Sequence, residues 1–216
     1  MGSIFLMTFH LVDTVNSLFC RVMFRVRSAV PSPVPLDGAV LLVANHSSYA
    51  DPLILSATAG RPITYVIAHE VYRNPWLRWM FKMFRYIPVK RHCQDVAAVR
   101  EMLRALDRGE VLGIFPEGGI DEHYRAEGHR GVGYLALKTG APIVPAGITW
   151  ERARPVSLCK ALFTPGQALV RYGTPFRLGS QSARDREVMA DATAKIMGAI
   201  RALAGDGDRK LHDNFG

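Results

Sequence analysis

Two short polar clusters each follow an apolar run, and both carry side chains suited to acid–base chemistry. Residues 45–51 (Asn-His-Ser-Ser-Tyr-Ala-Asp) follow one run, and residues 115–118 (Phe-Pro-Glu-Gly) follow another. His46 offers a general base, because neutral imidazole accepts a proton near pH 7. Asp51, five residues on, offers a carboxylate that would orient the ring. The pattern predicts an active site at a sheet edge; the alternative is a structural histidine at a strand end.

The pair Asp51-Pro52 stands at the start of an apolar segment with helical character. Aspartate before proline is typical of an N-cap followed by the first helical residue, so we expect Asp51 to cap this helix. The free N–H groups at a helix N-terminus favour negative charge. A carboxylate held there would fix the tautomer of His46 and stabilise the imidazolium that forms when His46 takes a proton.

Motif order makes the interpretation more specific. The two clusters, together with residues 143–146 (Ile-Val-Pro-Ala), resemble three ordered motifs of the glycerolipid acyltransferases, and above all of the 1-acylglycerol-3-phosphate acyltransferases. Residues 86–91 (Tyr-Ile-Pro-Val-Lys-Arg) resemble a further block of that family, an apolar stretch that ends in a basic residue. The resemblance runs from about residue 38 to about residue 150 and implies a glycerol-phosphate acyltransferase-like fold.

The resemblance also implies roles. His46 would be the general base and Asp51 its orienting partner, with acyl-CoA or acyl-carrier protein as donor, a lysophospholipid as acceptor and no cofactor. The residues it implies in substrate binding are Asn45, Ser47, Arg91, Glu117, Gly118, Gly119, Arg130 and Pro145.

Several of these residues have a second interpretation. Arg91 would grip an acceptor phosphate through its two-pronged guanidinium, or it is a solvated residue before a helix. Glu117 would bind the acceptor's polar head, or it is ion-paired within the fold. Gly118 and Gly119 would bring backbone N–H groups to the acceptor or the oxyanion. Pro145 would shape an acyl pocket, or it is a strand-end proline.

The chain departs from the family pattern at the expected phosphate clamp. The Glu-Gly block usually continues with Thr-Arg, but here it continues with Gly119-Ile120, and the usual Phe-Lys-x-Gly further on is Gly-His-Arg-Gly at residues 128–131. Arg125 or Arg130 would substitute for the absent arginine. The other possibility is an acceptor without phosphate, such as a lyso-aminolipid or a glycolipid.

Charge and aromatic residues indicate a membrane surface. The net charge is +8, and residues 72–91 contain six basic side chains and no acidic one. Helical spacing would place Trp76, Trp79, Met80 and Met83 on one face, which suits a lipid interface. The alternative is an aromatic core helix with a solvated basic rim. We expect a peripheral membrane protein at the cytoplasmic face.

Three segments are expected. We expect residues 1–36 to form amphipathic helices at the membrane interface, or else a helix packed on the domain. No run in this segment reaches the roughly 18 clean apolar residues of a spanning helix. Residues 37–204 predict an acyltransferase domain, and residues 205–216 a flexible tail. Strands and helices alternate along the middle segment, which predicts an α/β fold with a mixed, largely parallel central sheet flanked by helices. The predicted helices cover 52–58, 75–84, 95–108, 131–138 and 184–203, and the predicted strands cover 40–44, 63–68, 86–89, 111–115, 143–148 and 168–172.

Other classes of function have less support. The three cysteines are scattered, which indicates a reducing compartment, and no spacing predicts a metal site. No aromatic or zinc-finger signature predicts a nucleic-acid partner. Gly131-x-Gly133 fits a dinucleotide fingerprint but lacks a preceding apolar strand, so close helix packing is the default. A non-catalytic lipid-binding protein and a thioesterase-like hydrolase remain as alternatives.

Overall fold

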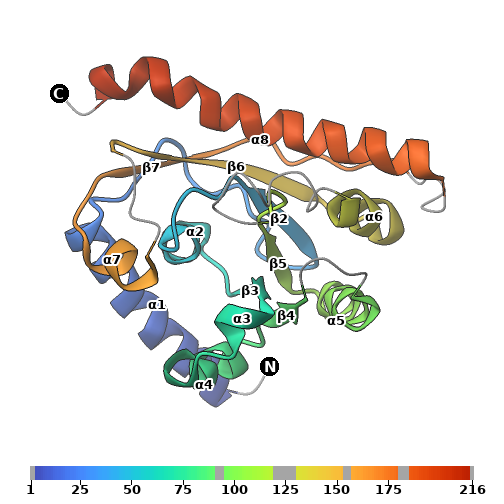
Figure 1. Ribbon diagram of the computed structural model, residues 1–216, viewed down its shortest axis with the longest axis horizontal. Coiled ribbons are helices and arrows are strands. Elements are labelled where there is room, and N and C mark those ends of the chain that lie inside the picture. The colour runs from blue at the N-terminus through green and yellow to red at the C-terminus, as the bar shows by residue number, and fades with distance from the viewer. Residues whose placement is uncertain (1–2, 91–94, 119–129, 153–156, 180–184, 215–216) are drawn as a thin grey trace.

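The computed structural model of the protein describes residues 3–90, 95–118, 130–152, 157–179 and 185–214, and for residues 3–10, 130 and 206–214 it describes the backbone alone. Within these ranges seven strands form one sheet in the order β1-β7-β6-β2-β5-β3-β4 (Figure 1). The strands are β1 (Arg27–Ser28), β2 (Val40–Ala44), β3 (Ile63–Ala68), β4 (Ile87–Val89), β5 (Val111–Ile114), β6 (Ile143–Trp150) and β7 (Ala168–Tyr172).

The sheet is mixed. Neighbouring strands run parallel, except that β6 and β7 pair antiparallel. The helices that connect and cover them are α1 (Ser3–Met23), α2 (Asp51–Ala59), α3 (His69–Tyr72), α4 (Pro75–Met83), α5 (Val96–Asp107), α6 (Arg130–Thr139), α7 (Leu158–Phe163) and α8 (Arg186–Asn214). This arrangement confirms the predicted α/β fold with a largely parallel central sheet.

Strand β2 lies at the centre, buried on both faces. Val40, Leu42 and Ala44 pack with side chains of α1 and α2, whereas Leu41 and Val43 pack with those of α5, α6 and α8. Burial on both faces explains why β2 is apolar at every position rather than at alternate positions. Each large side chain buried this way contributes about 1.5–3 kcal/mol to folding. Figure 1 shows α8 along one side of the sheet and α1, α2 and α7 on the other.

Helix α1 packs on α2 with one face and leaves another open. Cys20 and Phe24 are fully buried, and the Asn16 amide donates to the Leu53 carbonyl oxygen at 2.9 Å. Burial, and secondarily the charge of Asp13, raises the pKa of the Cys20 thiol to about 12, so this thiol is protonated at neutral pH. The opposite face carries an exposed apolar stripe of Leu11, Val15, Leu18 and Val22. Helix α1 therefore packs on the domain with one face and exposes an apolar stripe on the other. No helix in the described ranges has the length and apolarity required to cross a bilayer.

The structure differs from the predicted elements mainly at the ends and in the short pieces. The backbone of α8 continues to Asn214, although the sequence predicts a helix that ends at residue 203. Glycine lowers helix propensity by only about 1 kcal/mol, so Gly205 is not by itself a helix stop. Helices α3 and α7 and strand β1 were not predicted, because pieces of two to six residues carry no measurable periodicity.

Gly133 allows α6 and α8 to approach closely. A Cβ atom at this position would lie 2.4 Å from Thr193 Oγ1 and 2.6 Å from the Met189 carbonyl oxygen. The glycine of the Gly131-x-Gly133 pattern therefore serves helix packing, in agreement with the default interpretation.

We expect Gly133→Ala to lower the free energy of unfolding by about 1–3 kcal/mol, because the added methyl group must displace the α8 backbone. Chemical denaturation would measure it. Gly198→Ala is the matched control: it lies on the exposed side of α8, no atom comes within 4 Å of the place that its added methyl group would take, and it should stabilise the helix by up to about 1 kcal/mol. Equal stability of Gly133→Ala and the wild type would contradict the packing argument.

Candidate active site

The candidate site lies where two central strands end. Strands β2 and β5 are parallel neighbours, with Val43 opposite Ile114, so their carboxyl ends meet at the same edge of the sheet. This pairing brings residues 45–51 beside residues 115–118, as the two strand-end clusters predict. Ligands of open α/β sheets commonly bind at such carboxyl ends.

His46 and Asp51 form a hydrogen-bonded pair. The distance between His46 Nδ1 and Asp51 Oδ2 is 3.0 Å. The His46 side chain is 15% exposed and that of Asp51 is completely buried. A carboxylate accepts, so Nδ1 donates in this hydrogen bond, and in a neutral ring Nε2 then keeps its lone pair. This geometry would suit a general base whose orientation is set by a buried acid group.

Four donors surround the Asp51 carboxylate. Oδ2 accepts from the His46 ring and from the backbone N–H groups of Ser47 at 2.7 Å and Ser48 at 2.8 Å. Oδ1 accepts from the Trp150 indole Nε1–H at 2.9 Å. A buried carboxylate is tolerated when its oxygens are satisfied in this way.

The predicted N-cap role of Asp51 is wrong. The N-cap of α2 is Ala50, which makes no side-chain cap hydrogen bond, and Asp51 is the first helical residue. Its carboxylate turns back to the loop before the helix rather than forward along it. The N–H groups of that loop are closer partners, and Pro52 has no N–H to offer.

Contacts of its ring and of its backbone hold His46 in place. It stacks on Phe115, with ring centroids 4.2 Å apart, and Phe115 in turn lies parallel to Tyr65 at 6.0 Å. The backbone N–H of His46 donates to Glu117 Oε2 at 3.1 Å. Burial raises the pKa of Tyr65 well above its ordinary value, and its neutral hydroxyl donates to the Pro52 carbonyl oxygen at 2.8 Å. The His46 ring therefore packs against uncharged aromatic side chains.

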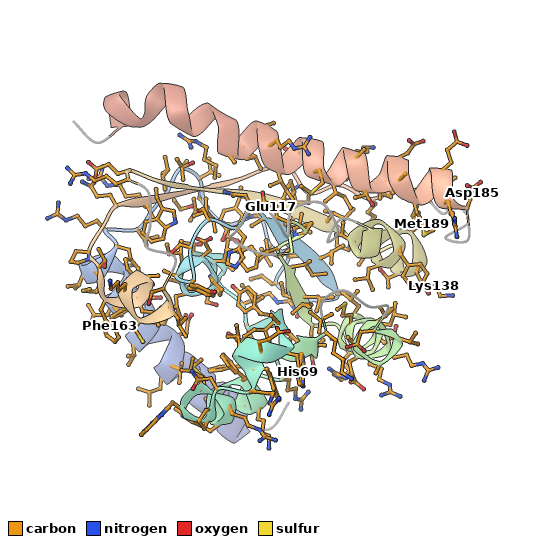
Figure 2. All side chains as sticks on the ribbon, viewed as in Figure 1. His69, Glu117, Lys138, Phe163, Asp185 and Met189 are labelled. Atoms are coloured by element: carbon orange, nitrogen blue, oxygen red, sulfur yellow. The ribbon has the colours of Figure 1, made fainter. Side chains whose placement is uncertain are left out.

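Two of the predicted substrate-binding side chains are engaged inside the protein. Glu117 commits one carboxylate oxygen to the backbone of His46. Asn45 makes a paired contact with the backbone of strand β6: its amide donates to the Ile148 carbonyl oxygen at 2.8 Å and accepts from the Ile148 N–H at 2.7 Å. Both contacts hold the loop that carries His46. Figure 2 shows Glu117 in the central part of the molecule, whereas Phe163 lies at its outer surface.

The remaining predicted residues fall into different places. The Ser47 hydroxyl is buried and has no hydrogen-bond partner in the described part of the chain. Gly118 adopts a left-handed φ of 74°, and its N–H donates to the Phe115 carbonyl oxygen at 3.1 Å, so that N–H closes a turn. The remaining three are the least described: Arg91 and Gly119 lie outside the described residues, and only the backbone of Arg130 is described, as the first residue of α6.

Pro145 lies away from the dyad. It pairs with Val43 in the middle of the buried strand β6, and its Cγ lies 2.9 Å from where a Gly173 Cβ would stand, beside Leu203 of α8. Val43 packs toward α8, and residues in register on parallel strands point to the same face. The ring therefore packs on the face opposite α2, which favours the strand-proline interpretation over a wall of an acyl pocket.

Trp150 is the site residue that sequence reasoning missed. The predicted strand ended at Ile148, two residues early, and left Trp150 outside the sheet. The alternation along β6 is the available signal, because Ala146, Ile148 and Trp150 share one face at a spacing of two. Nothing in the sequence pairs Trp150 with Asp51, which is 99 positions away.

The sequence and the fold are both similar to those of known acyltransferases. The family model described as Acyltransferase matches residues 24–149. The chain is 27% identical to a 1-acyl-sn-glycerol-3-phosphate acyltransferase of Bacillus subtilis over 144 residues, which are 66% of this chain and 69% of that protein. It is 30% identical to one of Borreliella burgdorferi, over 52% of this chain and 46% of that protein. It is 32% identical to a probable one of Mycoplasma pneumoniae, over 65% of this chain and 55% of that protein.

A solved structure shares the fold. The crystal structure of the 1-acyl-sn-glycerophosphate (LPA) acyltransferase PlsC of Thermotoga maritima superposes with a TM-score of 0.62 at 19% identity, covering 88% of this chain and 80% of that one. The family match spans more than half of the chain and contains both strand-end clusters. This chain therefore belongs to the acyltransferase family.

Proposed function

We propose that this acyltransferase moves a fatty acyl group from a thioester donor, acyl-CoA or acyl-carrier protein, to the hydroxyl of a lysophospholipid such as 1-acylglycerol-3-phosphate. The observation that carries the proposal is the 3.0 Å contact between the His46 ring and the fully buried Asp51 carboxylate. The relatives named as 1-acyl-sn-glycerol-3-phosphate acyltransferases support this acceptor.

The dyad supplies the proton transfer that the reaction needs. As the acceptor oxygen attacks the thioester carbonyl carbon, His46 Nε2 takes the hydroxyl proton. The Asp51 carboxylate holds the ring through Nδ1 and stabilises the imidazolium that results. The tetrahedral intermediate then expels the thiolate, which takes the proton from the imidazolium, so the ester and a free thiol are the products. The acceptor would reach the part of the His46 side chain, 15% of it, that is exposed.

The acceptor's headgroup is the least constrained part of the proposal. Glu117 and Asn45 act mainly on the His46 loop, so a phosphate would be held by basic residues such as Arg91 and Arg130, as the family resemblance implies. The second candidate is transfer to a non-phosphate lysolipid, an aminolipid or a glycolipid. It is favoured by the sequence Gly119-Ile120, where the family pattern has Thr-Arg.

We further propose that the enzyme works as a peripheral protein at the cytoplasmic face of a membrane. Helix α4 exposes Trp76 by 84% and Trp79 by 64%, next to the exposed cations of Arg78 and Lys82. Its packing face is centred instead on the buried Phe81, which stacks with Tyr72 and Tyr86. Exposed tryptophans beside basic residues suit the lipid headgroup region.

The apolar stripe of α1 also supports a location at a membrane surface. Its four exposed residues recur at spacings of four, three and four, which is one line along a helix. In the view of Figure 1, α1 and α4 both lie on the side of the molecule away from α8. Contiguous exposed apolar side chains on a protein surface typically mark an interaction surface.

Replacement of the base tests the proposed chemistry. We expect His46→Ala to lower kcat/KM for acyl transfer by about 10²- to 10⁴-fold, the usual contribution of a general base. The assay follows thiol release and identifies the lipid product by mass spectrometry, with vesicles that contain 1-acylglycerol-3-phosphate. His69→Ala is the matched control: His69 begins α3, is well separated from Glu117 in Figure 2, and should keep wild-type turnover.

The same assay separates the alternatives. Turnover of His46→Ala equal to that of the wild type would remove His46 as the base. Product formation with lyso-aminolipid or glycolipid acceptors alone would select the non-phosphate candidate. Thiol release without any acceptor would indicate a hydrolase, and vesicle binding without thiol release would indicate a lipid-binding protein.

Removal of the exposed tryptophans tests the membrane surface. We expect the double variant Trp76→Ser/Trp79→Ser to bind vesicles of phosphatidylglycerol and phosphatidylethanolamine at least about tenfold more weakly, because the two rings together lose more than about 1.4 kcal/mol of apolar burial. Vesicle co-sedimentation measures the loss. Leu36→Ser removes an equally exposed apolar side chain, 83% accessible, outside both helices and should bind normally. Unchanged binding of the double variant would refute the assignment of α4.

A further inference from the structure

Trp150 stands at the far end of the hydrogen-bond network that begins at His46. It is the last residue of β6, only 9% of it is exposed, and its indole N–H donates to Asp51 Oδ1 at 2.9 Å. The other carboxylate oxygen, Oδ2, receives the His46 ring and two backbone N–H groups. The indole is therefore the donor that satisfies the second oxygen.

The two-sided arrangement restrains the plane of the carboxylate. The terminal torsion of aspartate has a broad energy minimum, so donors on Oδ2 alone would leave the carboxylate plane some freedom to twist. With Oδ1 held by the rigid indole ring, rotation would break a hydrogen bond to a charged acceptor, one of the stronger kinds in proteins. Oδ2 then stays directed at His46 Nδ1.

The end of α1 supports the indole in turn. The Phe24 and Trp150 rings form a T-shaped pair with centroids 5.4 Å apart and planes at 84°. Phe19 and Phe24 form a second T-shaped pair at 5.6 Å. The Phe24 carbonyl oxygen also accepts from the N–H of Ala168, the residue opposite Trp150 on β7. Trp150 is thus fixed both by its ring contact and by the strand beside it.

We infer that Trp150 is a positioning residue for the acyl-transfer reaction: its indole N–H fixes the Asp51 carboxylate and, through it, the His46 base, while Phe24 at the end of α1 supports the indole ring. The inference rests on the proposed function of the dyad. It assigns a role in the reaction to a strand end 99 positions away from Asp51 in the sequence and to the helix that carries the exposed apolar stripe.

Trp150→Phe separates the hydrogen bond from the packing, because phenylalanine keeps a ring beside Phe24 but has no N–H. We expect kcat to fall about tenfold, the effect of losing one hydrogen bond to a charged group, and KM to change less than twofold, since the indole does not touch the substrate. Tyr172→Phe is the matched control. It removes the hydroxyl contact to Thr58 Oγ1, 2.7 Å long, from the same core and should keep wild-type kcat.

A double variant distinguishes positioning from a general structural role. In the His46→Ala background, Trp150→Phe should cause no further loss of the residual activity, because the indole acts only through the dyad. A further tenfold loss would show that Trp150 acts by another route and would overturn the inference. A wild-type kcat for Trp150→Phe, with His46→Ala inactive, would overturn the inference and leave the proposed function intact. An active His46→Ala would overturn both.

A spectroscopic test leaves Trp150 itself unchanged. In a ¹H–¹⁵N spectrum, the indole N–H of Trp150 should resonate downfield of those of Trp76 and Trp79 and exchange more slowly with solvent, because those two side chains are 84% and 64% exposed. Trp76→Phe and Trp79→Phe assign the three signals. An indole N–H of Trp150 that exchanges as fast as the other two would exclude its hydrogen bond to Asp51 and with it the positioning role.

Discussion

The Asp51 carboxylate is completely buried, and a buried carboxylate is stable only when donors reach both of its oxygens. The donors come from three places: the imidazole of His46, the backbone of Ser47 and Ser48, and the indole of Trp150. This requirement fixes the start of α2, the loop after β2 and the end of β6 relative to one another. The remaining contacts of the site, such as the paired hydrogen bonds of Asn45 with strand β6, reinforce the same relation.

The two faces of the sheet are covered by different sets of helices. On one face, α5, α6 and α8 pack on Leu41 and Val43, and glycines such as Gly133 allow backbones to approach within van der Waals contact. On the other face, α1 and α2 pack on Val40, Leu42 and Ala44. A closely packed scaffold limits the movement of the strands, and the strands hold His46 and Asp51 in place. On this face α1 is the outer helix, and it exposes an apolar stripe.

The sequence predicted the fold and the local dyad well, because both depend on short-range patterns. Apolar runs located six of the strands, and the alternation of strands and helices predicted the mixed sheet. His46 and Asp51 are five residues apart, so a single loop brings them together. The roles of Asn45, Glu117 and Gly118 were less predictable. Each is tied to an atom of the protein itself, and for Asn45 and Glu117 that atom lies 103 and 71 positions away.

By itself the sequence determined the family, the order of the motifs and the presence of a histidine with a carboxylate five residues away, because these are properties of residue type and spacing. Only the tertiary structure decided which donors satisfy Asp51, which face Pro145 occupies and how the end of α1 supports the site through Phe24. The physical reason is that a hydrogen bond is made between atoms that the packing of the sheet brings to within about 3 Å, and such packing joins strands that are far apart along the chain.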